Sequence, residues 1–426
     1  LDFNLVKEWL LDSTKDADYL IISLDALAYG GIIPSRIHHF SFDEIIEKTK
    51  IIEKIKQNNP KIKIFANELV ERCPAYNDSF EEPDYYATYG LSINQNGQLL
   101  DKQERGILTN DELDLMKKTR VLIPNEIIND FENRRKINLD AILHNLDYAK
   151  KGIIDFFSIP LDDCASYGYT QMDIRKIYKY IKENNIDNVL IYPGADEVGL
   201  DLLSRCINDY YKITPKVFLY YADENGKKKI PQFEDRAEEI VLDLHLKVEL
   251  CEQVSTKEEA DIICIVNCGD GFIFTLLPEK RESMSHRNFD EIVELLKWTK
   301  ENNKVSALAD VGYINEGDYE LFKYLYANNV LNFIDSYAGW NTNSNTFGTT
   351  MCGAVSFYHG RNIDKRNLNL FYRYCEDVLF MSDVRNELID HVNKYPSPEV
   401  SSFNLKLYAD AFSEYVVDGL KTRIKS

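Results

Sequence analysis

The stretch Phe156-Phe157-Ser158-Ile159-Pro160-Leu161-Asp162-Asp163 sets the pattern from which the fold of this chain can be predicted. It is an apolar run that ends abruptly on two carboxylates, and a helical pattern follows it. Other apolar runs along the sequence end in the same way, on Asp25, Asp196-Glu197, Asn267, Asp310 and Asp335. In α/β proteins the ligand binds beyond the carboxyl ends of the strands, so we expect these side chains to gather in one site.

Strand-like and helical patterns alternate through most of the sequence. Apolar runs occur near residues 19–24, 61–66, 154–161, 188–192, 216–221, 260–266, 305–309 and 331–335, and helical periodicity occupies 42–58, 171–185, 197–208, 289–302 and 317–328. This alternation predicts an α/β fold with a mainly parallel sheet. Eight strand-like runs suit a (β/α)8-barrel-like fold with an inserted cap and C-terminal helices. The barrel itself typically needs about 250 residues, and insertions add to that length. Two doubly wound Rossmann-like domains around a cleft are the alternative.

The domain organisation follows from the places where the alternation is interrupted. We expect an N-terminal α/β half over 1–210, a C-terminal α/β half over 211–355 and a helical extension over 356–426. Residues 71–150 form an insertion, in which a Tyr- and acid-rich loop precedes charged helices near 110–119 and 124–150. The insertion is predicted to form a lid or cap. An extra strand is expected at 246–251.

The charge balance narrows the classes of partner. The chain of 426 residues carries 50 basic and 70 acidic residues, for a formal net charge of −20. This balance argues against nucleic acid and anionic membranes as partners, because phosphate binding needs clustered Lys and Arg. A small neutral or cationic molecule fits better.

No apolar stretch approaches the roughly 20 residues of a membrane span. No leader pattern is present either, so a cytoplasmic location is expected. The first residue is Leu, which leaves a removed leader open, and the oligomeric state is not indicated.

Two pairs of adjacent carboxylates are the strongest indication of catalysis. Asp162-Asp163 and Asp196-Glu197 each follow an apolar run. Repulsion within such a pair lets one carboxyl group stay protonated near neutral pH while the other is ionised. The four residues are therefore candidates for the acid, base or nucleophile of glycoside cleavage. The structural alternative is that the Asp residues cap the next helix and that Glu197 is an acid of a first helical turn.

A polar segment with one tryptophan is the best candidate for substrate binding. Residues 335–349 contain Asn, Thr and Gly in a proportion that favours a polar loop over a helix or a strand. An aromatic face flanked by amides and hydroxyls is suited to a polyhydroxylated ring. The alternative is an elaborate helix N-cap with the tryptophan as core filler. The predicted binding residues of this segment are Tyr337, Trp340, Asn341, Thr342 and Asn345.

Further candidates for substrate binding lie at other predicted strand ends: Asp25, Arg36, Tyr167, Asp310 and Asn315. Asp310 is favoured because a buried strand end rarely carries an acid without a partner. Arg36 can clamp an anionic group of a ligand or form a structural salt bridge with Asp25. Asp318 is as consistent with a helix N-cap as with a ligand contact.

Histidine and cysteine spacing limits the metal chemistry. The seven His residues form no HxH, HExxH or HxxxH pattern near a strand end, which argues against a His-liganded zinc or iron centre. An oxygen-liganded Mg²⁺ or Ca²⁺ stays open, and no other cofactor is expected. The eight cysteines lie mostly alone within apolar segments and are interpreted as reduced core thiols.

Several strings taken together resemble a bacterial family of unknown function, DUF4127. They include Tyr29-Gly30-Gly31 with Pro34-Ser35-Arg36, Tyr192-Pro193-Gly194-Ala195-Asp196-Glu197, Phe233-Glu234-Asp235-Arg236 and Tyr337-Ala338-Gly339-Trp340-Asn341-Thr342. The resemblance spans roughly residues 15–355 and implies no activity. Members of this family usually begin with one further strand that ends in an acid-rich segment, which this sequence does not contain.

The sequence therefore predicts a carbohydrate-active hydrolase that acts on a small polyhydroxylated substrate, a sugar, through paired carboxylates. Two other hypotheses stay open. One is a divalent-metal-dependent α/β enzyme for a hydroxylated or phosphorylated small molecule, with Asp25, Asp163, Asp196 and Asp310 as ligands. The other is a solute-binding module without catalytic activity.

Overall fold

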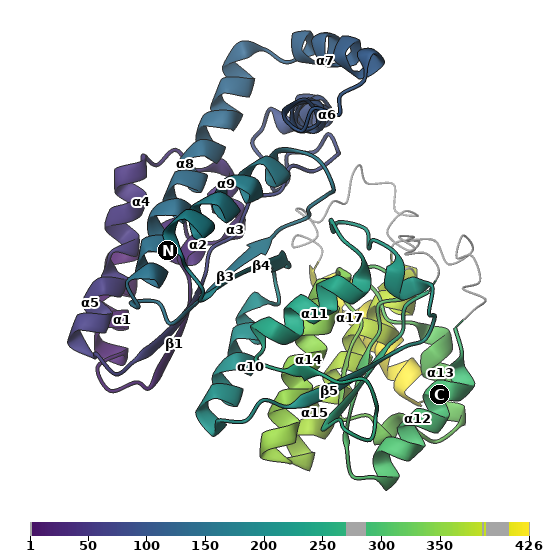
Figure 1. The fold of residues 1–426 in the computed structure, drawn as a ribbon. Coiled ribbons are helices and arrows are strands. Elements are labelled where there is room, and N and C mark those ends of the chain that lie inside the picture. The colour runs from purple at the N-terminus through teal and green to yellow at the C-terminus, as the bar shows by residue number, and fades with distance from the viewer. Residues whose placement is uncertain (1, 270–286, 386, 389–408, 426) are drawn as a thin grey trace. The chain divides into compact units, whose positions relative to one another are not determined.

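A computed structural model of the chain describes residues 2–269, 287–385, 387–388 and 409–425. It confirms the predicted α/β class and the parallel strands, which lie in two separate sheets (Figure 1). Neither sheet closes into a barrel within the described residues. The chain divides into a first unit, Leu1–Cys206 with Phe233–Arg236, and a second unit, Ile207–Gln232 with Ala237–Ser426.

The first unit contains a four-stranded parallel sheet in the order β1-β2-β3-β4. Each strand pairs with the next one along the chain, and connections between parallel strands are right-handed, so the crossover helices lie on one face. Figure 1 shows α4, α5, α8 and α9 on that face. Isoleucines and leucines of α5, α8 and α9 pack there against Ile64, Phe157 and Ile159. The strands are β1 (Tyr19–Ser23), β2 (Lys63–Asn67), β3 (Phe156–Leu161) and β4 (Val189–Pro193).

Local signals define several helix ends of the first unit. Ser41 with Glu44 and Thr109 with Glu112 form capping boxes at the starts of α4 and α7. The left-handed Asn185 ends α9. The helices are α1 (Phe3–Ser13), α2 (Leu24–Ala28), α3 (Ile32–Ile37), α4 (Phe42–Thr49), α5 (Ile51–Asn58), α6 (Tyr86–Glu104), α7 (Asn110–Leu122), α8 (Asn125–Lys150), α9 (Tyr169–Asn184) and α10 (Val198–Tyr211), the last of which crosses the boundary between the units.

Helix α6 packs on α9 through a glycine. A Cβ atom at Gly97 would overlap the ring of Tyr169. We therefore expect Gly97→Ala to lower the free energy of unfolding by about 1–3 kcal/mol, because the buried ring cannot move freely. Urea denaturation followed by circular dichroism measures the change.

Gly199 in α10 provides the matched control. Apart from the neighbouring backbone of α10 itself, no described atom lies within 4 Å of a Cβ built there. Gly199→Ala should therefore be neutral or should stabilise the protein by up to about 1 kcal/mol, since alanine favours helix. Equal effects of the two substitutions would contradict the close packing of α6 on α9.

The second unit contains a five-stranded parallel sheet in the order β6-β5-β7-β8-β9. Numbered within the unit, this is the doubly wound order 2-1-3-4-5, with helices on both faces. On one face Ile263, Ile265 and Leu308 pack with α12 and α13. On the other face Cys264, Val266 and Ala307 pack with α11 and α14. The strands are β5 (Lys216–Tyr221), β6 (Glu252–Gln253), β7 (Ile262–Val266), β8 (Val305–Ala309) and β9 (Ser336–Ala338).

The described helices of the second unit include a π-helix, η4, which directly continues α15. Cys264 and Cys268, the two cysteines that lie close together in the sequence, are buried. The helices are η1 (Gly226–Lys228), α11 (Glu238–Val248), α12 (Phe289–Glu301), α13 (Tyr319–Ala327), η3 (Leu331–Phe333), α14 (Asn343–Gly360), α15 (Ile363–Arg373), η4 (Tyr374–Val384) and α17 (Ala409–Lys425).

Three local predictions were wrong. Residues 331–333 form a 3₁₀ helix, and the strand begins only at Ser336. The strand expected at 246–251 is the end of α11 and a turn, followed by the two-residue strand β6. The segment predicted as a polar loop becomes helical at Asn343, because the buried Phe347 and Met351 anchor α14 to the sheet. Tertiary burial here outweighs the low helix propensity of Asn, Ser and Thr.

Candidate functional site

Acids and an arginine follow three neighbouring strands of the first unit at the same edge of the sheet. Asp25 lies in α2 directly after β1, and Asp162 and Asp163 follow β3. A parallel bridge between Val70 and Leu161 extends the pairing of β2 with β3. This bridge brings Arg72, two residues after Val70, next to the carboxylates that end β3.

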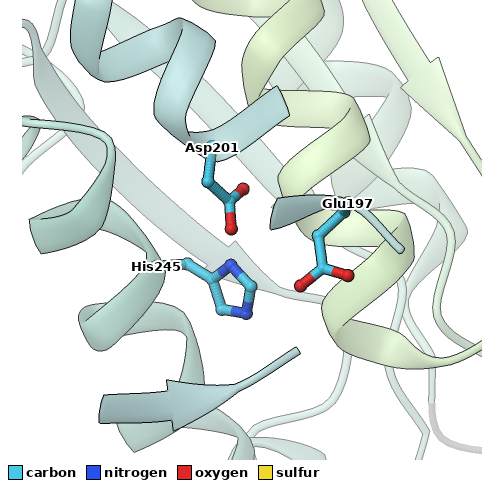
Figure 2. Close-up of side chains that lie close together, drawn as sticks. All are labelled: Glu197, Asp201 and His245. Carbon is cyan, nitrogen blue, oxygen red and sulfur yellow. The ribbon is translucent and has the colours of Figure 1, made fainter. Parts of the chain in front are cut away.

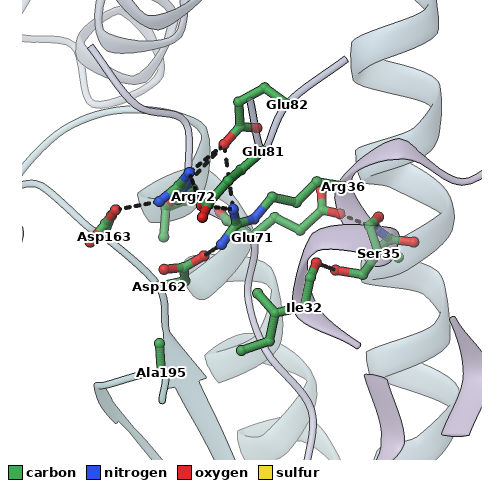
Figure 3. Close-up of polar contacts among 12 residues, drawn as sticks. Ile32, Ser35, Arg36, Glu71, Arg72, Glu81, Glu82, Asp162, Asp163 and Ala195 are labelled. Carbon is green, nitrogen blue, oxygen red and sulfur yellow. Dashed lines mark hydrogen bonds and ion pairs between the residues drawn. The ribbon is translucent and has the colours of Figure 1, made fainter. Parts of the chain in front are cut away.

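Six charged residues form an arginine–carboxylate cluster at this edge: Arg36, Arg72, Glu81, Glu82, Asp162 and Asp163 (Figure 3). Arg36 from α3 donates from Nη2 to Asp162 Oδ2 at 2.5 Å and from Nη1 to Glu81 Oε2 at 3.0 Å. Arg72 donates from Nη1 to Asp163 Oδ2 and from Nη2 to Glu81 Oε2, both at 2.8 Å. Its Nε donates to Glu82 Oε1 at 2.8 Å. Both terminal nitrogens of each guanidinium group thus contact carboxylates.

Asp163 combines access to solvent with an unusual backbone. Its side chain is 23% exposed, whereas that of Asp162 is 6% exposed. Its φ of 33° is rare for a residue other than glycine, and such strain is concentrated at functional sites. Burial and the negative charge of Asp162 raise the pKa of Asp163 to about 6, against the opposing effect of Arg72. Asp163 is therefore placed to exchange a proton near neutral pH.

A second layer of acids lies behind the cluster. Burial raises the pKa of Asp25 to about 7, although its carboxylate accepts a hydrogen bond from the Leu69 backbone. Burial likewise raises the pKa of Glu71 to about 7 and that of Glu68 well above its ordinary value. Glu71 and Glu68 accept hydrogen bonds from carboxamides of α8, Asn138 and Asn145. Groups with strongly shifted pKa values indicate a functional site when they gather at a strand edge.

The second predicted carboxylate pair is placed differently from the first. Glu197 is buried and folds back to accept a hydrogen bond from the Ala195 backbone at 3.1 Å. Its carboxylate lies within 4.8 Å of that of Asp201, one turn further along the chain. Figure 2 shows the two side chains. Asp196 is exposed. His245, drawn in the same figure, belongs to the second unit and packs edge-on against Phe347.

Tyr167, a predicted binding residue of the first unit, is also exposed. Its ring lies 5.1 Å from Lys102 Nζ.

Asp310 is the centre of a buried polar network in the second unit. Its Oδ1 accepts from Asn267 Nδ2 at 2.7 Å, and its Oδ2 accepts from Tyr337 Oη at 2.7 Å and from the Asp318 backbone at 2.6 Å. Burial, and then the charge of Asp318, raise the pKa of Asp310 to about 6. Asp318 is the N-cap of α13 and pairs with Arg287. The buried Asp310 thus has the partners that the sequence argument required.

The predicted sugar-binding residues of the second unit separate into two groups. Asn315, Trp340 and Asn341 line a cavity of about 400 Å³ together with residues of η4. Tyr337 and Asn345 are buried, and Thr342 is the N-cap residue of α14. The cavity therefore contains only part of the predicted set.

Comparison with known proteins gives one match. Residues 2–426 match the family model described as "Protein of unknown function (DUF4127)". The chain belongs to this family. No curated protein and no solved structure matches it. Membership in DUF4127 confirms the resemblance seen in the sequence motifs.

Sequence reasoning missed three members of the arginine–carboxylate cluster in this DUF4127 protein. Arg72, Glu81 and Glu82 lie in the segment interpreted as a lid. The available signal was the charged pair Glu71-Arg72 shortly after an apolar run, which is the pattern used for the other strand ends.

Among the described residues, no helix is both long and apolar enough to cross a membrane.

Proposed function

We propose that this protein is a carbohydrate-active hydrolase that cleaves a glycosidic bond at the arginine–carboxylate cluster of the first unit. The observation that carries the proposal is that Asp163 and Glu81 are held by the two terminal nitrogens of one guanidinium, that of Arg72. With both contacts at 2.8 Å, the two bound oxygens lie at most about 8 Å apart. Glycoside hydrolysis uses two carboxyl groups about 5 to 9.5 Å apart.

The surroundings of the two groups support distinct roles. Asp163, whose pKa is raised to about 6 by burial and by Asp162, is the proton donor to the glycosidic oxygen. Glu81 accepts hydrogen bonds from both arginines and acts as the carboxylate. In the inverting form of the reaction, Glu81 takes a proton from water while the water oxygen bonds to the anomeric carbon. The leaving alcohol departs with the proton of Asp163. Glu81 thus has the role that the sequence analysis gave to Asp196 or Glu197.

The charge of the cluster supports a neutral substrate. Four carboxylates surround two guanidinium groups, so the arginines are already neutralised and the site repels phosphate groups. The carboxylate oxygens can accept further hydrogen bonds from vicinal hydroxyls, whereas an apolar substrate would displace water from these charged groups and offer no hydrogen bond in return. A polyhydroxylated substrate therefore matches the side chains best.

A panel of 4-nitrophenyl glycosides, assayed from pH 5 to 8 with and without EDTA, tests the proposal. We expect turnover of at least one glycoside and no loss of activity in EDTA. Activity that disappears in EDTA would favour the metal-dependent alternative. A ligand-induced rise in melting temperature without turnover of any glycoside would favour a solute-binding module.

A further inference from the structure

The cavity lined by Asn315, Trp340 and Asn341 lies at the carboxyl end of β8 and β9 in the second unit. Its volume of about 400 Å³ is within the range of small-molecule sites, about 300–1,000 Å³. Loops after both strands form one wall, and Arg373 from the end of α15 with Glu376 and Met381 from η4 form the other. We call this cavity the Trp340 pocket. π-Helical turns are frequent at functional sites.

The wall formed by the loops is rigid. Asn315 and Asn341 both have left-handed backbones, with φ of 65° and 52°, and the Asn315 backbone donates to the Asn341 carbonyl at 2.9 Å. Gly339 packs so closely that an added Cβ would lie 2.9 Å from the Cα of Gly317. Backbone strain held by tight packing is typical of ligand sites. The backbone that carries the two carboxamides is therefore held in place.

The tryptophan is also fixed. Its backbone N–H donates to Thr346 Oγ1 at 2.9 Å, and its indole Nε1 donates to Thr349 Oγ1 at 3.0 Å. Because its polar atom is already bonded, the partly exposed ring offers a ligand only its apolar surface. A flat or slightly puckered ring with polar edges is the shape that such a surface and two carboxamides accommodate.

Arg373 supplies the cation of the pocket lining. Its Nη1 lies 3.2 Å from Oδ1 of the buried Asp377, which also accepts from the Gly339 backbone at 3.0 Å. Its Nη2 donates to Glu376 at 2.7 Å, but the Glu376 side chain is 63% exposed. An exposed ion pair three residues apart contributes little, so a ligand carboxylate can replace Glu376 with small loss. A phosphate dianion fits less well than a carboxylate, because it would bring a second negative charge next to Glu376 and Asp377.

We propose that the Trp340 pocket binds a carboxylated sugar ring of the hexuronic acid class, with its carboxylate on Arg373, its ring on Trp340 and its hydroxyls on Asn315 and Asn341. This site lies wholly within the second unit. It does not depend on the hydrolysis proposed for the first unit, because it is defined by binding and not by turnover.

Ligand-observed NMR titration of the whole chain with sodium D-glucuronate, sodium D-galacturonate and D-glucose tests the proposal. We expect at least one uronate to bind at least 10-fold more tightly than glucose. Arg373→Met should remove this preference, and Trp340→Ala should weaken binding of the uronate at least 10-fold. Trp340→Phe should retain most of the binding, since it keeps an apolar ring.

The sharpest variant is Glu376→Gln, which removes the competing carboxylate. We expect it to tighten uronate binding by about 2- to 5-fold, because the ligand carboxylate no longer has to displace Glu376 from an exposed ion pair with Arg373. Glu320→Gln is the matched control, because Glu320 is 73% exposed and forms the same type of pair with Lys323, at 2.6 Å. It should leave binding unchanged. Equal binding of glucose and uronates, weaker binding by a folded Glu376→Gln protein, or no uronate binding by the folded wild type would overturn the proposal.

Discussion

Asp163→Asn should lower the turnover of an unactivated glycoside by about 10²- to 10⁴-fold, the contribution of a positioned general acid. Asparagine keeps the size of the side chain and an oxygen that can accept the Arg72 hydrogen bond, so the cluster should stay folded. The loss should be much smaller for a 2,4-dinitrophenyl glycoside, because that leaving group departs without a proton. Steady-state kinetics on the two substrates separates loss of acid catalysis from general damage.

The pH dependence gives a second readout of the same residue. Burial and Asp162 raise the pKa of Asp163 to about 6, so its acid form is lost as the pH rises through that value. Wild-type turnover should therefore decline above about pH 6, and this decline should be absent in Asp163→Asn. Glu183→Gln, at a side chain that is 61% exposed on α9, is the control and should match the wild type. Activity of Asp163→Asn within a few-fold of the wild type on unactivated glycosides would exclude Asp163 as the acid.

The regular parts of the fold were predictable because their signals are local. The run from Phe156 to Asp163 shows both its apolar strand and its polar end in consecutive residues, and the structure contains β3 at 156–161. The helical pattern at 289–302 likewise corresponds to α12 at 289–301. Helix α6 was missed, since Gly90 and Gly97 and several amides interrupt any apolar stripe along it. These small residues serve the close approach of neighbouring rings, which a pattern of periodicity does not report.

The site was only partly predictable because its pairs are distant in sequence. Asp25, Asp162 and Asp163 could be placed at one sheet edge from their positions after strands. The contact of Arg36 with Asp162 joins residues 126 positions apart, and that of Arg72 with Asp163 joins residues 91 apart. No local pattern specifies such a partner. A salt bridge between Arg36 and Asp25 is one alternative that the sequence leaves open, whereas the structure pairs Arg36 with Asp162, Glu81 and Glu82.

Arg72→Met should lower the free energy of unfolding by about 3–5 kcal/mol, the effect of removing one partner from a buried ion pair. The Arg72 side chain is 10% exposed and contacts Glu82, which is 4% exposed, as well as Glu81 and Asp163. Without the cation, these carboxylates would repel one another in a buried setting. Urea denaturation measures the change. Lys117→Met is the control, because that lysine is 65% exposed and its pair with Asp114 should contribute less than about 1 kcal/mol.

The destabilisation by Arg72→Met should also depend on pH, with a sign that follows from the charges. Arg72 lowers the pKa of Asp163 and of Glu82, both of which burial raises. Removal of Arg72 raises both pKa values further. The folded variant then holds protons on these carboxyl groups at a pH at which the unfolded chain has already released them. Its stability therefore falls as the pH rises. The difference from the wild type should therefore be smaller at pH 5 than at pH 8. A difference that is constant over this range would mean that Arg72 stabilises the first unit through packing of its aliphatic stem and not through its charge.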